Sequence, residues 1–582
     1  MTQNQPGRKI KTWDSIIIII SLIGILVCIS VFFPQVRRMI MDFAEQIVQK
    51  EASTYESWLK VLVSYAMGGI FFILFIDYCT LTASGKALVH KVKQEIMDCL
   101  SEIDFRSFLK PVLLLSGVYL LGIFTIIRAN FLYMDDIGWA VSGHREWFNW
   151  SRYVIVFLSY FVQPEIRMTD ISPIPQLLAA IFLSISSVLL IYVIGDKKIT
   201  VVRLLASIPL GLSPYFLESL SYKFVAIYGA LSTLSCIVPF LFITRKKAFI
   251  FCSILSLLIM CMISQAAAGI YMLIVIILCF KDWNSREKAN KEILSFIGSA
   301  AFSFCFALLL FKLFLMKPAD YYTSSAMHPV SHIISGVFNN IKDYAMTVNH
   351  DFGLIWKTGI TLVLIFFIIK SMYQSEQKKL LSFIMSTLVI LISFILSYGI
   401  FILLEIPFYA PRGLVGFGVF LAIMCIYIVS NYKKIAIVAV LALNWCFFVF
   451  AFSYGNALAD QTRYAEFRVS ILLHDLSNLY PNADSEDISI QLKNSIDFTP
   501  SIKNISKQNP VIERLIPRRL GADHVWNVFY YLEYFNYIPF SKANIPFIKS
   551  VDFDALNLPV VLDSYYHTIQ SDGNRILVVL KH

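Results

Sequence analysis

The sequence predicts an all-α polytopic membrane protein that ends in a small α/β domain, and three observations support this fold class. Of the 582 residues, 57% are hydrophobic and only 15% are charged, and the mean hydropathy is +0.68. A soluble domain cannot bury so much apolar surface. Apolar runs long enough to cross a bilayer recur up to residue 452 and then stop. The net charge of +10 gathers in the short connections between these runs, which indicates membrane topology rather than nucleic-acid binding.

The positions of the basic residues set the predicted topology. The first apolar run follows Arg8, Lys9 and Lys11 and is longer than the apolar region of a signal peptide, so we expect an anchor with a cytoplasmic N-terminus. Each later basic cluster falls after an even number of crossings, as the positive-inside rule requires. This gives about thirteen crossings, an odd number that places the C-terminus outside. The predicted crossings are 13–33, 59–79, 111–128, 172–195, 199–213, 223–243, 248–264, 265–280, 292–316, 353–370, 380–403, 412–430 and 434–452.

Two kinds of segment test this assignment. The apolar run 248–280 would form a helix of about 50 Å, which is longer than the ~30 Å hydrocarbon core. Because basic clusters flank both of its ends, we expect it to leave and return, with a turn near 264–269. The run 150–162 would reverse the later topology if it crossed, so we place it in the interface as an amphipathic helix, and 37–50 has the same pattern.

The apolar runs also divide the chain into three predicted domains. They are an N-terminal transmembrane pair with interfacial helices (1–110), a transmembrane core (111–452) and a C-terminal domain (453–582). The last has nearly balanced charge and no cysteine, which suits an oxidising outer compartment. In it we expect helices at 460–479 and 524–534, and strands at 558–562 and 576–580 that flank the turn 572–574 as a short hairpin.

Cysteine usage argues against two common frameworks. All ten cysteines lie in or beside apolar runs, and no His/Cys cluster has the spacing of metal ligands. A disulfide framework is therefore excluded, and a structural zinc site is not expected.

The connection after the third predicted crossing carries two adjacent carboxylates, Asp135 and Asp136. At the low dielectric of a helix exit, two such groups need a cation, a metal or a hydrogen-bonding substrate nearby. One of them could then hold a raised pKa and act as a general base. Alternatively, both carboxylates cap the next helix and face water.

Other polar residues gather on the same predicted outer side. Lys223 lies with Glu218 in a Tyr-rich connection, where its ammonium could bind a phosphate. In the alternative role, the Lys223 side chain reaches the lipid head groups and pairs with the nearby Glu218. Gln265 lies at the predicted turn, where a hydrogen bond between helices is the alternative role. The guanidinium of Arg412 could bind a phosphate through two of its N–H groups, or it could anchor the chain at the membrane interface. An acidic pair, two cations and an amide on one side are the layout expected of an enzyme that acts on a lipid-anchored phosphosugar.

Several short motifs follow one another between residues 111 and 280. They are 134–139, Gly143 with His144, 150–152, 170–173 with Gln176, 213–218, 220–224 and 264–266. In this order and spacing they resemble the GtrII-type O-antigen glucosyltransferases of bacterial serotype conversion. Val225 departs from that family, in which an Asp often follows the Tyr-Lys-Phe segment.

The resemblance implies a GT-C-like fold in the bacterial inner (cytoplasmic) membrane, with the active site and the C-terminus in the periplasm. It implies transfer of glucose from polyprenyl-phosphate-glucose to a hydroxyl of the O-antigen of lipopolysaccharide. Asp135 or Asp136 would be the base that deprotonates this hydroxyl. Lys223 and Arg412 would bind the donor phosphate. The other substrate-binding residues expected from the resemblance are Glu218, Tyr222, Gln265, His144 and Arg152.

The chemistry of such a donor makes modest demands on the protein. A polyprenyl phosphate leaves readily once cations stabilise it, so a positioned base and an electropositive cradle suffice. With one base and no second carboxylate placed as a nucleophile, a single inverting displacement is the simpler hypothesis. No cofactor is required, and a divalent metal is compatible with this chemistry but is not implied.

Two alternatives to sugar transfer stay open. An O-antigen polymerase or ligase also joins lipid-linked sugars outside the membrane, but its long outer loop is expected late in the chain. A flippase or transporter for lipid-linked sugars would place ionisable groups at mid-helix and show internal repeats of hydropathy. Here the acidic motif follows the third predicted crossing, Arg203, Glu405 and Lys312 lie towards helix ends, and the sequence shows no repeat of hydropathy.

Overall fold

The computed structural model describes residues 83–316, 326–430, 434–481, 488–521, 525–538 and 545–581. All of them lie in one compact unit, Phe75–His582. The predicted crossings 13–33 and 59–79 and the predicted interfacial helix 37–50 lie outside the described residues.

Seven helices in the described part of the chain are long and apolar enough to cross a membrane. They are α5 (Arg106–Ala129), α8 (Ile174–Ile194), η4 with α14 (Gln265–Ser285), α15 with η5 (Asn290–Leu315), α17 (Leu354–Tyr373), α18 (Lys379–Leu396) and α20 (Lys434–Leu479). An eighth candidate is broken: α9 (Val201–Ala206) and α10 (Pro209–Leu212) meet α11 (Pro214–Ser221) at 63°. The predicted number of about thirteen crossings is therefore not confirmed.

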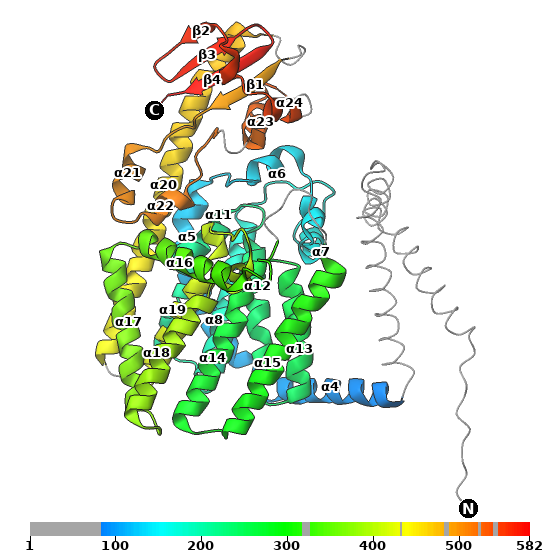
Figure 1. Cartoon of the computed structure of the whole chain (residues 1–582), viewed down its shortest axis with the longest axis vertical. Helices are drawn as coiled ribbons and strands as arrows, with labels where there is room; N and C mark the ends of the chain where they lie inside the picture. The colour runs from blue at the N-terminus through cyan, green and yellow to red at the C-terminus, as the bar shows by residue number, and fades with distance from the viewer. Residues whose placement is uncertain are drawn as a thin grey trace, which may run out of the picture. The chain divides into compact units, whose positions relative to one another are not determined.

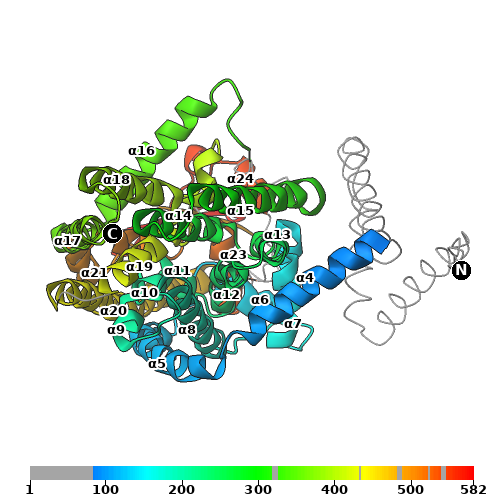
Figure 2. The same cartoon turned by 90° about the horizontal axis from the view of Figure 1, so that it is seen from below.

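Some predicted crossings form helices that are shorter than a full span. These are α12 (Ala226–Ile237) with η3 (Val238–Phe242), α13 (Lys246–Cys261) and α19 (Gly416–Val429). Every residue of α19 is buried. It packs against α14, α17 and α20, and the view from below shows it enclosed by other helices (Figure 2). A helix of about 21 Å can serve in this position because protein rather than lipid surrounds it.

The predicted break in the run 248–280 is confirmed. α13 ends at Cys261, the turn η4 (Gln265–Ala267) follows, and α14 (Ala268–Ser285) returns. At this turn Gly269 packs directly against the backbone carbonyl of Leu396, where a Cβ atom would collide. The helix α7 (Tyr153–Val162) lies in the run 150–162, which we placed in the interface. It has 10 residues, too few to cross a bilayer.

Two helices lie apart from the upright spans. α4 (Ala83–Ser101) and α16 (Ile333–Asp351) run across the direction of the spans, at opposite ends of them (Figure 1). α6 (Asp136–Ser142) and η2 (Glu146–Trp150) lie at the same end as α16 and the C-terminal sheet (Figure 1).

α20 connects the membrane part to the C-terminal part. Its 46 residues extend about 69 Å, roughly twice the hydrocarbon thickness, so one helix runs through the predicted boundary at 452. The predicted domain boundaries at 110 and 452 stay predictions. The expected helix at 460–479 is the end of α20, and the expected helix at 524–534 is α23 (Val525–Tyr534).

The C-terminal region contains a four-stranded sheet of order β1-β4-β3-β2. β1 (Ser489–Lys493) is parallel to β4 (Arg575–Leu580), and β3 (His567–Ser571) pairs antiparallel with both β4 and β2 (Val560–Asp563). The predicted hairpin was wrong in one respect, because β3 rather than 558–562 precedes the turn 572–574. The sequence reasoning missed β3. Its buried positions are His567, Ile569 and Ser571, and only one of these residues is apolar, so the strand lacks an alternating hydrophobic pattern. The remaining helices are α21 (Pro500–Ser506), α22 (Val511–Leu515) and α24 (Ile545–Ser550).

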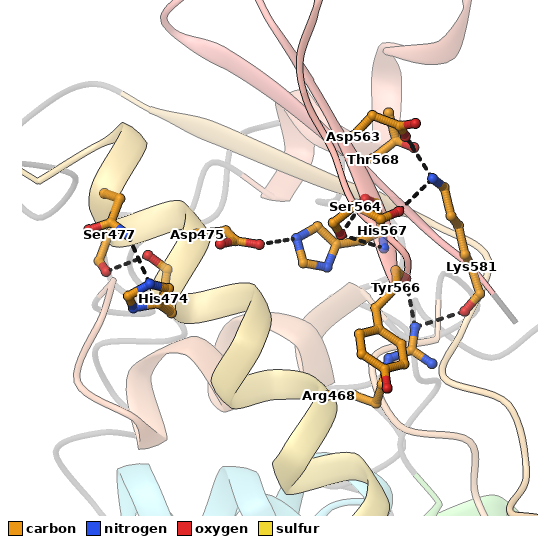
Figure 3. A network of polar contacts seen from close by, with 11 residues as sticks. Arg468, His474, Asp475, Ser477, Asp563, Ser564, Tyr566, His567, Thr568 and Lys581 are labelled. Atoms are coloured by element: carbon orange, nitrogen blue, oxygen red, sulfur yellow. Dashed lines mark hydrogen bonds and ion pairs between the residues drawn. The ribbon is translucent and has the colours of Figure 1, made fainter.

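Polar contacts fix this sheet to α20 (Figure 3). The Arg468 guanidinium donates to the backbone carbonyls of Tyr566 and Lys581, both at 2.7 Å. About two turns further along the helix, the carboxylate of Asp475 lies 3.0 Å from Nε2 of the buried His567. The helix that crosses the membrane therefore also holds the sheet in place.

The two ends of α8 have different surroundings. Asp170, before the helix, pairs with Lys223, which follows α11. Asp196, after the helix, pairs with Lys281, whose ammonium also donates to the carbonyl of Ile194 (3.1 Å). The 21 residues of α8 extend about 31 Å, close to the ~30 Å thickness of a hydrocarbon core.

Candidate active site

The acidic pair lies where α5 passes into α6. Asn130 ends α5 in the left-handed conformation (φ 49°), and Met134 also has a positive φ of 45°. Asn tolerates this conformation and sometimes ends a helix in it, whereas it costs a residue such as Met134 about 1–3 kcal/mol. The strained loop turns Asp136 inward and leaves Asp135 exposed.

Asp136 is fully buried and ties two segments together. Its Oδ2 accepts hydrogen bonds from the backbone N–H groups of Tyr133 and Lys223, both at 2.9 Å. Its Oδ1 is buried without a hydrogen-bond partner among the described residues. Burial is the main cause that raises the pKa of Asp136 to about 8, and the charge of Asp135 also raises it. The backbone N–H groups that bond the carboxylate lower this pKa, but their effect is smaller. At neutral pH Asp136 therefore mostly holds a proton.

Two ion pairs, each with one buried member, adjoin the acidic pair. The side chain of Lys223 pairs with Asp170 while its backbone holds Asp136. Arg412 pairs with Glu218 through its guanidinium, and its backbone N–H donates to Glu218 Oε2 at 2.6 Å. The structure thus brings the acidic pair, Glu218, Lys223 and Arg412 together from three segments that are far apart in the chain.

Local sequence explains how α11 presents Glu218. Pro214 begins the helix, where its missing N–H is not needed, and the Ser213 side chain caps the helix by accepting from the N–H of Phe216 (3.4 Å). α11 then ends at Ser221, and the chain continues in an extended conformation through Tyr222 to Lys223. Glu218 and Lys223 therefore lie at the same end of this short helix.

Aromatic rings form a wall beside these charges. The ring of Tyr222 lies 4.9 Å from that of Tyr133 and 6.4 Å from that of Trp139. Trp139 in turn contacts Trp147 at 5.3 Å. The Arg412 guanidinium lies 5.8 Å above the Tyr222 ring. Ring faces next to hydrogen-bonding groups suit a sugar, which has both apolar C–H faces and hydroxyls.

Three predicted site residues are not linked to this group by the contacts just described. Gln265 lies in η4, which packs against α12 and η7 (Gly399–Leu403). His144 is exposed after α6, and its backbone N–H donates to Ser142 Oγ (3.3 Å). Arg152 is exposed before α7, and its backbone N–H donates to the Trp147 carbonyl (3.1 Å).

The structure adds residues that sequence reasoning missed. Asp170 and Tyr133 stand inside or beside the motifs noted above, and a search for charge partners of Lys223 could have selected Asp170. Tyr133 donates through its hydroxyl to the carbonyl of Leu515 (2.6 Å). Arg519 donates to the carbonyl of Leu132. No signal in the sequence joined the C-terminal segment to the acidic loop, because the pairs are separated by more than 380 residues.

A second contact joins the same C-terminal segment to the membrane part. Asp351, at the end of α16, accepts from the Tyr215 hydroxyl of α11 (2.8 Å) and pairs with Arg514 of α22. The C-terminal segment is therefore attached both to the acidic loop and to the end of α16.

Metal ligation is not evident in the part of the chain that the structure describes. There, no group of three or more His, Cys, Asp or Glu residues lies close enough together to hold a metal ion.

Comparison with known proteins gives the family. No solved structure shows a significant match. The chain is 23% identical over 426 residues to a protein of Salmonella phage P22 described as an uncharacterized 55.3 kDa protein in the gtrB 5′ region, a match that covers 71% of this chain and 87% of the phage protein. Residues 124–423, just over half of the chain, match the glucosyl transferase GtrII family, and they include the acidic pair, Glu218, Lys223 and Arg412. The chain belongs to the GtrII glucosyltransferase family.

Proposed function

We propose that this protein transfers a glucosyl residue from polyprenyl-phosphate-glucose to a hydroxyl of lipopolysaccharide O-antigen, at the periplasmic face of the bacterial inner membrane. The observation that carries the proposal is the buried group of charges around the acidic pair, within a membrane chain of a glucosyltransferase family. Neither alternative function, a polymerase or ligase or a flippase, has a specific observation in its favour.

The distribution of cations supports the outer location of the site. The connection after α14 carries Arg286 and Lys288, and the connection after α17 carries Lys378. Gln377 bonds both Trp283 and Arg286, so these connections lie together. They lie at the end of the spans opposite to α6 and the C-terminal sheet (Figure 1). Because basic connections favour the cytoplasmic side, the acidic pair would face the periplasm.

In this proposal the two carboxylates have different roles. Asp135 is exposed and can reach an acceptor hydroxyl, so we assign it as the general base. Asp136 is a positioning residue, because its buried carboxyl holds the backbones of Tyr133 and Lys223. A protonated Asp136 also avoids two adjacent negative charges.

The reaction is a single inverting displacement. Asp135 accepts the proton of the acceptor hydroxyl while the hydroxyl oxygen attacks the anomeric carbon of the donor glucose. The bond between that carbon and the phosphate oxygen breaks, and its electron pair leaves on the polyprenyl phosphate. Lys223 and Arg412 lie near the phosphate, and Glu218 and Tyr222 contact the sugar. Gln265, His144 and Arg152 would contact outer parts of the two substrates.

A transfer assay with the full chain in lipid nanodiscs tests the proposal. The assay supplies polyprenyl-phosphate-glucose labelled in the sugar and purified O-antigen, and it measures the anomeric configuration of the product by NMR. We expect transfer with inversion by the wild type, transfer about 10²–10⁴-fold slower by Asp135→Asn, and a smaller reduction by Asp136→Asn. Wild-type rates in both variants would remove the acidic pair from the mechanism.

A further inference from the structure

Among the described residues around the acidic pair, one buried cation has no carboxylate partner. Lys223 and Arg412 are each neutralised, by Asp170 and Glu218. Arg519 is only 6% exposed and forms no ion pair in the described part of the chain. Its Nε is buried and without a hydrogen-bond partner among those residues.

Arg519 comes from the C-terminal region but contacts the acidic loop directly. Its Nη2 donates to the carbonyl of Leu132, and the guanidinium carbon lies 3.9 Å from the centre of the Phe131 ring. The ring of Tyr531 lies 5.1 Å from the same carbon. Leu132 and Phe131 belong to the loop that ends in Asp135 and Asp136. Arg519 is therefore held beside the site by one carbonyl and two rings.

A buried guanidinium that lacks a counter-charge is costly. Ring contacts offset part of this cost. Asp136 and Glu466 are carboxyls whose charges act on Arg519, but neither forms an ion pair with it in the described part of the chain. Burial also raises the pKa of Asp136 to about 8, so its charge offsets little of this cost at neutral pH. Nε of Arg519 lacks a hydrogen-bond partner among the described residues, which indicates that a ligand completes the hydrogen bonds of this guanidinium.

The geometry of a guanidinium favours one class of ligand. The N–H groups of a guanidinium point along its plane, where two of them can bind two oxygens of one phosphate. The only anionic group of the proposed donor is its phosphate.

We propose that Arg519 binds the phosphate of the lipid-linked donor, so that the C-terminal region completes the active site. This inference rests on the proposed function. As the glycosidic bond breaks, the phosphodiester monoanion of the donor becomes a phosphate monoester with a second negative charge. Arg519 stabilises that charge, the new bond forms between the acceptor oxygen and the anomeric carbon, and the proton passes to Asp135.

Binding measurements with the full chain in nanodiscs of neutral lipid test this site. The probe is polyprenyl phosphate, with polyprenol as the phosphate-free control and inorganic phosphate as the lipid-free control. We expect Arg519→Gln to weaken polyprenyl phosphate binding at least tenfold and to leave the weak binding of polyprenol unchanged. Inorganic phosphate that binds as tightly as polyprenyl phosphate, with the same dependence on Arg519, would overturn the assignment to a lipid-linked phosphate.

Arg518→Gln is the matched control. Arg518 is the adjacent residue, is exposed, and lies 4.9 Å from the ring of Phe498. We expect its binding of polyprenyl phosphate to equal that of the wild type. An equal loss in both variants would show a general effect of charge and would overturn the proposal.

Folding and function are separated by two further readouts. If Arg519→Gln does not fold, Arg519→Lys replaces it, because Lys keeps the charge but lacks the planar fork of the guanidinium. We expect Arg519→Lys to bind polyprenyl phosphate at least threefold more weakly than the wild type. An unchanged affinity would overturn the proposal. Glucose transfer by the wild type together with unchanged binding by Arg519→Gln would remove only the role of Arg519. Binding through Arg519 without any glucose transfer by the wild type would leave the phosphate site standing and reject the proposed function.

Discussion

The two ends of α8 carry the same kind of ion pair in different surroundings. Lys223 and Asp170 have side chains that are 5% and 36% exposed, whereas Lys281 and Asp196 are 20% and 61% exposed. The first pair adjoins Asp136 through the backbone of Lys223, and the second lies among basic connections. An exposed ion pair contributes about 0–1 kcal/mol to the free energy of unfolding, whereas a buried charge without a partner destabilises the fold. The comparison teaches that burial, not residue type, distinguishes the end at which we propose the chemistry.

The largest expected difference between the two ends is in catalysis. Asp135→Asn should lower the rate of glucosyl transfer by about 10²–10⁴-fold, because a positioned base contributes that much to a proton transfer. Asp196→Asn, at the other end of α8, should transfer at the wild-type rate. Initial rates in the nanodisc assay measure both. Equal losses in the two variants would break the distinction between the ends.

The next effect concerns the second buried pair. Glu218→Gln leaves the guanidinium of Arg412 without its partner, and since that side chain is 33% exposed we expect the low end of the known range, a loss of about 3 kcal/mol. Chemical denaturation in mild detergent measures the loss against the wild type. The matching change in the exposed pair, Lys281→Gln, should cost about 1 kcal/mol or less. A comparable cost for both changes would contradict the role assigned to burial.

A pH-dependent effect should separate Asp136 from the exposed carboxylates. The pKa of Asp136 is about 8 in the folded protein and about 3.9 when the chain is unfolded. The unfolded state therefore binds fewer protons between these values, so the stabilisation by protonated Asp136 is complete below pH 4 and is lost as the pH rises through 8. Asp136→Asn should remove this decline.

The melting temperature in detergent between pH 5 and 9 measures that decline. Wild type and Asp196→Asn should both lose stability relative to Asp136→Asn as the pH rises. Parallel curves for all three proteins would show that Asp136 is already ionised in the fold.

The sequence predicted the membrane class and the family because both depend on local signals. Long apolar runs, basic connections and the turn in 248–280 are short-range patterns, and the turn was confirmed. The number of crossings was not, since a buried helix such as α19 can be shorter than a lipid-exposed one. Composition alone does not reveal which apolar helix faces protein and which faces lipid.

The candidate site divides in the same way. Glu218, Lys223, Arg412 and the acidic pair could be selected as polar residues near helix ends, and the structure brings them together. Which carboxylate is buried depends on the strained loop at Met134, which sequence periodicity does not encode. The contribution of Arg519 depends on a contact across 387 positions of the chain, which no local pattern predicts.

Analysis of surface polysaccharide tests the central claim most directly. O-antigen is isolated from host cells that lack the protein and from the same cells that express the wild type, Asp135→Asn or Asp196→Asn, and its glycosyl composition and linkages are determined. The account predicts an added glucose branch with the wild type and Asp196→Asn, and none with Asp135→Asn or without the protein. An unchanged polysaccharide with the wild type, or a full glucose branch with Asp135→Asn, would contradict it.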